Sequence, residues 1–419
     1  MKSTLVIRRL TGLALVALLV AACGTATSTP TPAPTPTGAP GATATDTAAA
    51  TDTATATVGG PASTPAPRVA WVHGQTVKQD VLVSAGTGWV LTTTGLWQTI
   101  DDGVSWANAY PHSLIASKIR GLGAFDANHA LLAVADVATT TTTYYLWHTA
   151  NAGLTWAYTA LPAMPHDDLT PCDACFSQLG DPLATFDYVD ANTAFVSVGM
   201  LRGADGRINY IYQTTDGGVT WVPRSYDPTL LGSISTPPIR VQFSTATTGV
   251  AEFDNVISST TSGWGHWTTR RLPTEDYGEP TVCFLSSTYW FADEGLAVGT
   301  VHYTYAISPD QGNSWVDHQS SVPGIALLTG ATVRAITPLI WIGTERTSNS
   351  SGYHDGPATT VYTVDGGAHW AMYGTQPFNG SVATFVDADH GWAGPTAEAP
   401  TAKLYSTSDR GLTWRLLTP

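Results

Sequence analysis

The sequence predicts an all-β fold, a seven-bladed β-propeller of four-stranded antiparallel blades preceded by a disordered linker. Two observations predict it: one octapeptide recurs seven times, and its copies are spaced as blades are. The octapeptide has Ser or Thr first, Asp or Asn third, Gly fifth and Trp last. The copies are 99–106, 149–156, 214–221, 260–267, 308–315, 363–370 and 407–414.

The spacing fits blades of four short strands. The closing tryptophans lie 50, 65, 46, 48, 55 and 44 residues apart. Such intervals accommodate four strands of about five or six residues with loops of variable length. The segments before each copy are short apolar or alternating runs, as strands are. Seven copies therefore predict seven blades, each formed by one continuous stretch of chain.

The conserved positions of each octapeptide predict a hairpin corner. In the third copy, the Asp216 carboxylate can accept backbone N–H groups two or three residues on, and Gly218 supplies the positive φ of a tight hairpin. Trp221 covers the corner. We interpret these residues as structural: Asp101, Gly103, Trp106, Asn151, Gly153, Trp156, Asp216, Gly218, Trp221, Trp267, Asp310, Gly312, Trp315, Asp365, Gly367, Trp370, Asp409, Gly411 and Trp414. The fourth copy keeps only Thr260 and Trp267.

The N-terminus has the features of an export signal. Lys2, Arg8 and Arg9 precede the apolar run 10–22, which is too short to span a bilayer of roughly 30 Å and fits a signal peptide, residues 1–23. Leu19-Val20-Ala21-Ala22-Cys23 resembles the lipobox of bacterial lipoproteins, which implies a lipid on Cys23. The alternative is an ordinary secretory signal with an incidental cysteine. We expect an exported chain, anchored to the outer face of the bacterial cytoplasmic membrane through this lipid only.

Residues 24–67 predict a disordered tether, because they are almost wholly Thr, Ala, Pro, Ser and Gly and cannot bury enough apolar surface. The propeller is then 68–419, with 68–73 as a spare strand at the outer edge of a terminal blade or over the closing seam. Without Lys2, Arg8 and Arg9, 15 basic residues face 32 acidic ones. This balance excludes nucleic acid as a partner.

The octapeptide with its upstream Gly-Trp strands (Gly88-Trp89, Gly391-Trp392) resembles the Asp-box, or bacterial neuraminidase, repeat. That repeat occurs in sialidases, sortilin-type receptors, xyloglucan hydrolases and photosystem II assembly factors, and the full pattern is most similar to the last group. The resemblance implies a propeller with its ligand site on the face away from the boxes, and a scaffold or assembly role. We expect a monomer without cofactor that binds a protein or glycan of the cell envelope.

Three long loops are candidates for that ligand face. The first, 162–182, carries His166, Asp168 and the pair Cys172 and Cys175. In an exported chain this pair favours a small disulfide loop; a redox site and a metal site remain as alternatives, and we expect no metal. Cys283, in another strand, reads as a buried free thiol.

The other two loops are 274–279 and 344–360. The loop 344–360 carries Arg346 and His354. The alternative interpretation is a solvent-exposed surface loop without a functional site. Glu275 and Tyr277 in the first resemble the Glu-activated Tyr of sialidases. Sialidases also need an arginine triad, and residues 80–106 contain no arginine. An extracytoplasmic glycoside hydrolase is the alternative to the binding function, and no catalytic residue is assigned.

Overall fold

A computed structural model describes fourteen ranges: 56–58, 67–71, 75–137, 142–162, 184–202, 206–224, 240–253, 256–271, 281–296, 302–321, 332–346, 357–379, 382–394 and 403–417. Cys23, the predicted signal peptide and nearly all of the predicted tether lie outside them. No helix within these ranges is long and apolar enough to cross a membrane.

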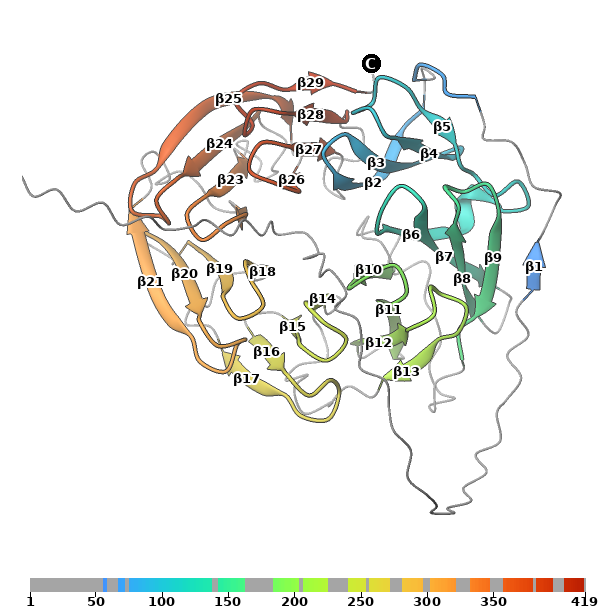
Figure 1. Cartoon of the computed structure of the whole chain (residues 1–419), viewed down its shortest axis with the longest axis horizontal. Helices are drawn as coiled ribbons and strands as arrows, with labels where there is room; N and C mark the ends of the chain where they lie inside the picture. The colour runs from blue at the N-terminus through green and yellow to red at the C-terminus, as the bar shows by residue number, and fades with distance from the viewer. Residues whose placement is uncertain are drawn as a thin grey trace, which may run out of the picture.

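Seven antiparallel sheets form a closed ring, which confirms the predicted seven-bladed propeller (Figure 1). Blade 1 comprises β2 (Val77–Ser84), β3 (Thr87–Thr92), β4 (Leu96–Thr99) and β5 (Ala107–Asn108). Blade 2 comprises β6 (Ile119–Ala124), β7 (His129–Val137), β8 (Thr142–Ala150) and β9 (Trp156–Ala160). Blade 3 comprises β10 (Ala184–Tyr188), β11 (Ala194–Arg202), β12 (Gly206–Thr214) and β13 (Val222–Arg224). Blade 4 comprises β14 (Arg240–Phe243), β15 (Gly249–Phe253), β16 (Val256–Thr260) and β17 (Thr268–Arg271).

The remaining three blades repeat the pattern. Blade 5 comprises β18 (Thr281–Phe284), β19 (Trp290–Leu296), β20 (His302–Ser308) and β21 (Val316–Ser321). Blade 6 comprises β22 (Thr332–Ala335), β23 (Trp341–Arg346), β24 (Pro357–Thr363) and β25 (Ala371–Asn379). Blade 7 comprises β26 (Val382–Phe385), β27 (Gly391–Gly394), β28 (Tyr405–Thr407) and β29 (Arg415–Leu416). Each blade is continuous in sequence, as predicted, and the described part contains one short 3-10 turn, Ala116–Lys118.

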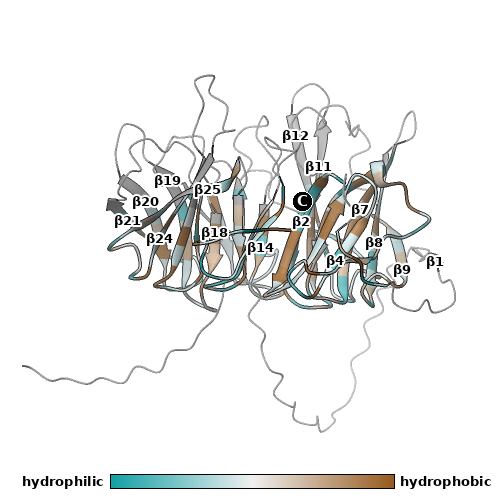
Figure 2. Cartoon of the chain, turned by 90° about the horizontal axis from the view of Figure 1, so that it is seen from above, coloured by the Kyte–Doolittle hydropathy of each residue, from teal (hydrophilic) through white to brown (hydrophobic). Residues whose placement is uncertain are grey.

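Strand direction divides the connections between two faces of the disc. Because neighbouring strands are antiparallel, the first-to-second and third-to-fourth hairpins of every blade lie on one face. The octapeptides are the third-to-fourth hairpins, so we call this side the box face. It forms the lower edge in Figure 2. The second-to-third connections and the connections between blades belong to the opposite face.

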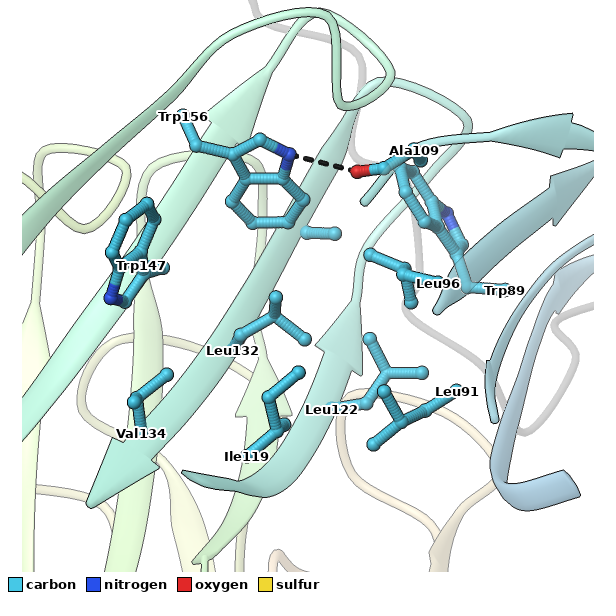
Figure 3. Packing of buried hydrophobic residues seen from close by; sticks show 11 residues of the cluster. Trp89, Leu91, Leu96, Ala109, Ile119, Leu122, Leu132, Val134, Trp147 and Trp156 are labelled. Carbon is cyan, nitrogen blue, oxygen red and sulfur yellow. Dashed lines mark hydrogen bonds between the residues drawn. The ribbon is translucent and has the colours of Figure 1, made fainter. Parts of the chain in front are cut away.

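The hydrophobic core lies between blades rather than within them. In the contact of blades 1 and 2, Trp89 and Leu96 pack with Leu122 and Leu132 (Figure 3). The Trp156 indole of blade 2 donates to the Ala109 carbonyl at 3.0 Å across the same contact. Trp89, Trp341 and Trp392 also pack between blades, because all three are at most 2% exposed and belong to such clusters.

Side chains, not a shared sheet, close the ring between blades 7 and 1. Asp102 accepts the Ser406 hydroxyl at 3.0 Å and pairs with Arg415 at 2.6 Å. The spare N-terminal strand also belongs here, since Val69 pairs with Trp106 at the outer edge of blade 1. Trp71 packs edge-on against Trp106 with 5.0 Å between ring centroids. Of the two predicted placements, the outer edge of a terminal blade is confirmed for the described residues, and Trp71 belongs to the apolar cluster at the closing seam.

A second piece of the N-terminal region adds to the ring. The short strand β1 (Ala56–Val58) pairs antiparallel with β9, the outermost strand of blade 2. Blade 2 therefore has five strands. This strand lies within residues 24–67, where the sequence predicted a disordered tether.

Candidate functional site

Each regular octapeptide satisfies most of its polar groups internally. In the third copy, the Asp216 carboxylate accepts the Thr220 N–H at 2.9 Å and the Thr220 hydroxyl at 2.6 Å. Thr214 Oγ1 accepts the Gly218 N–H at 2.9 Å, and the Trp221 indole donates to the Gly218 carbonyl at 3.1 Å. The carboxylate thus caps the N–H four residues on, and the N–H of Val219, three residues on as the sequence indicated, also hydrogen-bonds to it.

Two successive residues of the turn have positive φ. The second is the expected glycine, for example Gly312 at 79°. The first is variable, with Gln311 at 63° in the same copy. Close packing also requires glycine here. A Cβ on Gly312 would lie 2.8 Å from the ring of Trp290, on β19 of the same blade, and 2.6 Å from the Cβ of Ser259, on β16 of blade 4. The fifth position is therefore fixed by the turn and by close packing together.

The hydrogen bonds keep the box carboxylates ionised. The pKa of Asp365 is lowered to about 2, chiefly by the backbone N–H of His369 and then by the side chains of His369 and Thr363. The pKa of Asp310 is also lowered, first by the Ser314 hydroxyl. The degenerate fourth copy has no such carboxylate. There, Thr260 donates its hydroxyl to the Gly263 carbonyl at 2.6 Å, and Gly263 has a φ of 67°.

Acidic side chains on the inner strands link three blades to the next one. Asp187 of β10 accepts the Phe243 N–H of β14 at 2.6 Å. Acids on the second strands of blades 4 and 5 also accept a backbone N–H of the next blade. Glu252 of β15 accepts the Val282 N–H at 2.7 Å, and Asp293 of β19 accepts the Val333 N–H at 2.6 Å. Gln79 links blades 1 and 2, because its side-chain amide accepts the Leu122 N–H and donates to the Leu122 carbonyl. The blades are separate sheets, so no backbone ladder joins them, and these side chains provide hydrogen bonds between neighbouring blades instead.

Replacing Glu252 by alanine should lower the free energy of unfolding by about 1.5 kcal/mol, since it leaves the buried Val282 N–H without its acceptor. Glu252→Gln retains an acceptor oxygen and should lose less than half of that amount. Urea unfolding of both variants checks the expectation. Equal losses would mean that packing, rather than the hydrogen bond, links blades 4 and 5.

The first-to-second hairpins carry a second repeated cap that the sequence analysis missed. Asp126 accepts the N–H groups of Asn128 and His129 at 2.6 and 2.8 Å. The same positions of other blades hold Asp190, Thr245, Ser286, Thr337 and Asp387, each accepting N–H groups two and three residues on. The recurring pattern of an Asp, Ser or Thr three or four residues before the second strand could have revealed it.

One carboxyl near the ring axis stands apart from these structural groups. Asp80 lies on β2, the inner strand of blade 1, beside Gly394 of blade 7. It keeps a small exposed area, but the protein around it removes solvent and raises its pKa to about 7. At neutral pH this carboxyl is therefore part protonated.

The predicted ligand-face residues fall outside the described ranges, apart from one. His166, Asp168, Cys172, Cys175, Glu275, Tyr277 and His354 are not described. Arg346 ends β23 and pairs with Ala358 of β24, so the predicted loop 344–360 was wrong at both ends: 344–346 and 357–360 are strand. The described strand ends that flank all three predicted loops lie on the face opposite the boxes.

In the described ranges no group of three or more His, Cys, Asp or Glu side chains is arranged to hold a metal ion. Cys283 is buried, as predicted, and its sulfur forms no disulfide with any described residue.

No protein-family model and no curated protein matches the chain. Solved structures that resemble it include a GH74 xyloglucanase from Xanthomonas campestris, with 12% identity, TM-score 0.48, and coverage of 84% of this chain and 55% of that one. An α-L-arabinanase from Penicillium chrysogenum has 11% identity, TM-score 0.36, and coverage of 82% and 99%. A sialidase from Streptococcus pneumoniae has 11% identity, TM-score 0.26, and coverage of 78% and 77%. This chain spans about half the length of the xyloglucanase. All three are distant, and their likeness is one of fold.

Proposed function

We propose that this chain is an exported, lipid-anchored propeller that binds a protein or glycan of the cell envelope on the face opposite the boxes. The resemblance of its octapeptides to those of the photosystem II assembly factors supports a scaffold role. The lipobox-like sequence ending at Cys23 supports its place at the outer face of the cytoplasmic membrane.

One observation carries the choice of binding over hydrolysis. Asp187, Glu252 and Asp293, acids on the two inner strands of their blades, each hold a backbone N–H of the next blade at 2.6 to 2.7 Å. Glycoside hydrolysis needs two carboxyl groups facing the bond to be cleaved, about 5–9 Å apart and free to exchange a proton or attack. Carboxylates committed to the ring are poorly suited to that role.

Site-specific crosslinking tests the proposal. The full chain, processed in a bacterial envelope, would carry a photoreactive amino acid in place of Arg346, at the end of β23 on the opposite face. The matched control carries it in place of Val222, exposed on the outer strand β13. We expect one discrete crosslinked species from position 346 and none from position 222. Equal crosslinking from both positions would contradict the proposal.

The hydrolase alternative has its own test. The full chain would be assayed for release of sugar from sialosides, xyloglucan and arabinan, beside its Glu275→Gln and Tyr277→Phe variants. We expect no turnover by any of the three proteins. Turnover that both substitutions abolish would replace the binding function with a hydrolase.

A further inference from the structure

The inner strand of blade 1 differs from the other six at one position. In every blade the strand pairing runs from the first octapeptide residue through the second strand to the inner strand, and it places Asp80 level with an apolar residue of each other blade. The six equivalent residues, five of them buried, are Leu122, Phe186, Val241, Val282, Val333 and Ala383. The position faces the preceding blade, as Val282 does in its cluster with Val250 and Ile257. Asp80 thus puts a carboxyl where the ring otherwise has an apolar contact.

The opposing position on the preceding blade is also exchanged at the closing seam. In blades 4 and 5, the fourth residue of the second strand is an acid, Glu252 or Asp293, which accepts a backbone N–H of the next blade. Blade 7 has Gly394 there, on β27, which lies beside β2 of blade 1 (Figure 1). A Cβ on Gly394 would lie 2.7 Å from Cγ of Asp80 and closer still to Oδ1. At this seam the acid therefore belongs to blade 1, and the glycine of blade 7 makes room for it.

The Asp80 carboxyl lacks the partner that the other acids have. No hydrogen bond or ion pair joins it to a described residue, and burial alone raises its pKa to about 7. The strands β3, β26 and β27 carry no titratable side chain. On β2 itself Lys78 is exposed, and on β6 Arg120 donates to the carbonyls of Ser117 and Ile119. Closure of the seam therefore disfavours the ionised carboxyl, and none of these groups compensates for it.

We propose that Asp80 is a pH-operated latch, which keeps blades 7 and 1 closed while it is protonated and lets them part locally when it ionises. The seam is suited to this role because the two blades share no strand. The polar contacts of Asp102 with Ser406 and Arg415 hold the blades together at the box hairpin of blade 1, whereas Asp80 lies on the inner strand. This property is separate from the proposed binding function and does not depend on it.

The direction of the pH effect follows from solvation of the carboxyl. When the blades part, water reaches Asp80 and its pKa returns towards 3.8. The open form therefore gives up its proton at a lower pH than the closed form. Between pH 4 and 7, opening must become more favourable as pH rises, and above pH 7 the effect levels off.

Thiol labelling measures this opening against a reference in the same chain. Val90 pairs with Asp80 from β3 and is fully buried in the cluster with Trp392 of blade 7, so Val90→Cys places a thiol in the seam. The reference is Cys283, which is buried in the cluster between blades 5 and 6. The full chain is alkylated with iodoacetamide, and peptide mass spectrometry gives the rate at each position. The ratio of the two rates cancels the common effect of pH on thiol reactivity.

We expect the ratio of position 90 to Cys283 to rise about tenfold or more between pH 5 and 8. Adding Asp80→Asn to the same protein should keep the ratio within about twofold over this range. If the thiol of Val90→Cys is open at every pH, Val77→Cys reports the same cluster from β2.

Two results would overturn the proposal. A ratio that does not change with pH would mean that the two seams open together, as they do when the whole ring unfolds. An equal rise with and without Asp80→Asn would mean that another group controls the seam.

Discussion

Replacing Gly88 by alanine is expected to lower the free energy of unfolding by about 3 kcal/mol. Gly88 lies on β3 in blade 1, directly under the Trp392 ring of blade 7. A Cβ there would lie 2.6 Å from Cζ3 of that ring and nearer still to Cη2. Overpacking of this kind forces side chains or backbone to move, which costs about 1–3 kcal/mol and occasionally more.

The Trp392 ring has little room to yield. It is 1% exposed, and its indole N–H donates to Asp102 at 3.3 Å, so a displaced ring would give up a bond of the closing seam. Gly265→Ala is the matched control, because a Cβ there would meet nothing closer than 3.7 Å. Urea unfolding should show almost no change for the control. A loss of less than about 1 kcal/mol for Gly88→Ala would mean that the seam is loosely packed.

Replacing Asp80 by asparagine is expected to raise the free energy of unfolding at pH 8 by about 2–4 kcal/mol. In the folded chain, removal of solvent raises the pKa of this carboxyl from 3.8 to about 7. Between pH 4 and 7 the folded state therefore binds more protons than the unfolded state. The free energy of unfolding must fall as pH rises through this window, and the neutral amide avoids that loss.

The same variant provides its own control. Near pH 3, below both pKa values, position 80 is mostly neutral in the folded and the unfolded parent as it is in the variant, so the two proteins should unfold at nearly the same denaturant concentration. The difference should grow steadily towards pH 7 and then level. A difference that does not change with pH would show that Asp80 is as well solvated when folded as when unfolded.

Local repeats explain why so much of the fold could be predicted from the sequence. Most hydrogen bonds of each regular octapeptide lie within its eight residues, as those of Thr214, Asp216 and Thr220 do, so its turn can be recognised from local sequence. Seven copies then determine the number of blades. The Asp126-type caps are equally local, and their pattern was available in the sequence but was not recognised.

The links between blades could not be predicted, because their partners are distant backbone groups. Nothing near Glu252 or Asp293 in sequence marks them as acceptors for Val282 and Val333, which lie 30 and 40 residues away. The raised pKa of Asp80 likewise depends on blade 7, more than 300 residues later. The candidate ligand residues were chosen by loop length and chemistry alone, and Arg346 shows how far that approach can misplace a strand end.

We propose that the octapeptides carry the fold while the envelope partner binds on the opposite face. Asp216→Ala tests this division most directly. The variant loses the cap on Thr220, so its free energy of unfolding should fall by about 1–2 kcal/mol. Crosslinking from position 346 should keep its full yield in the same protein. A lost crosslink with unchanged stability would contradict the claim and make the octapeptide part of the binding site.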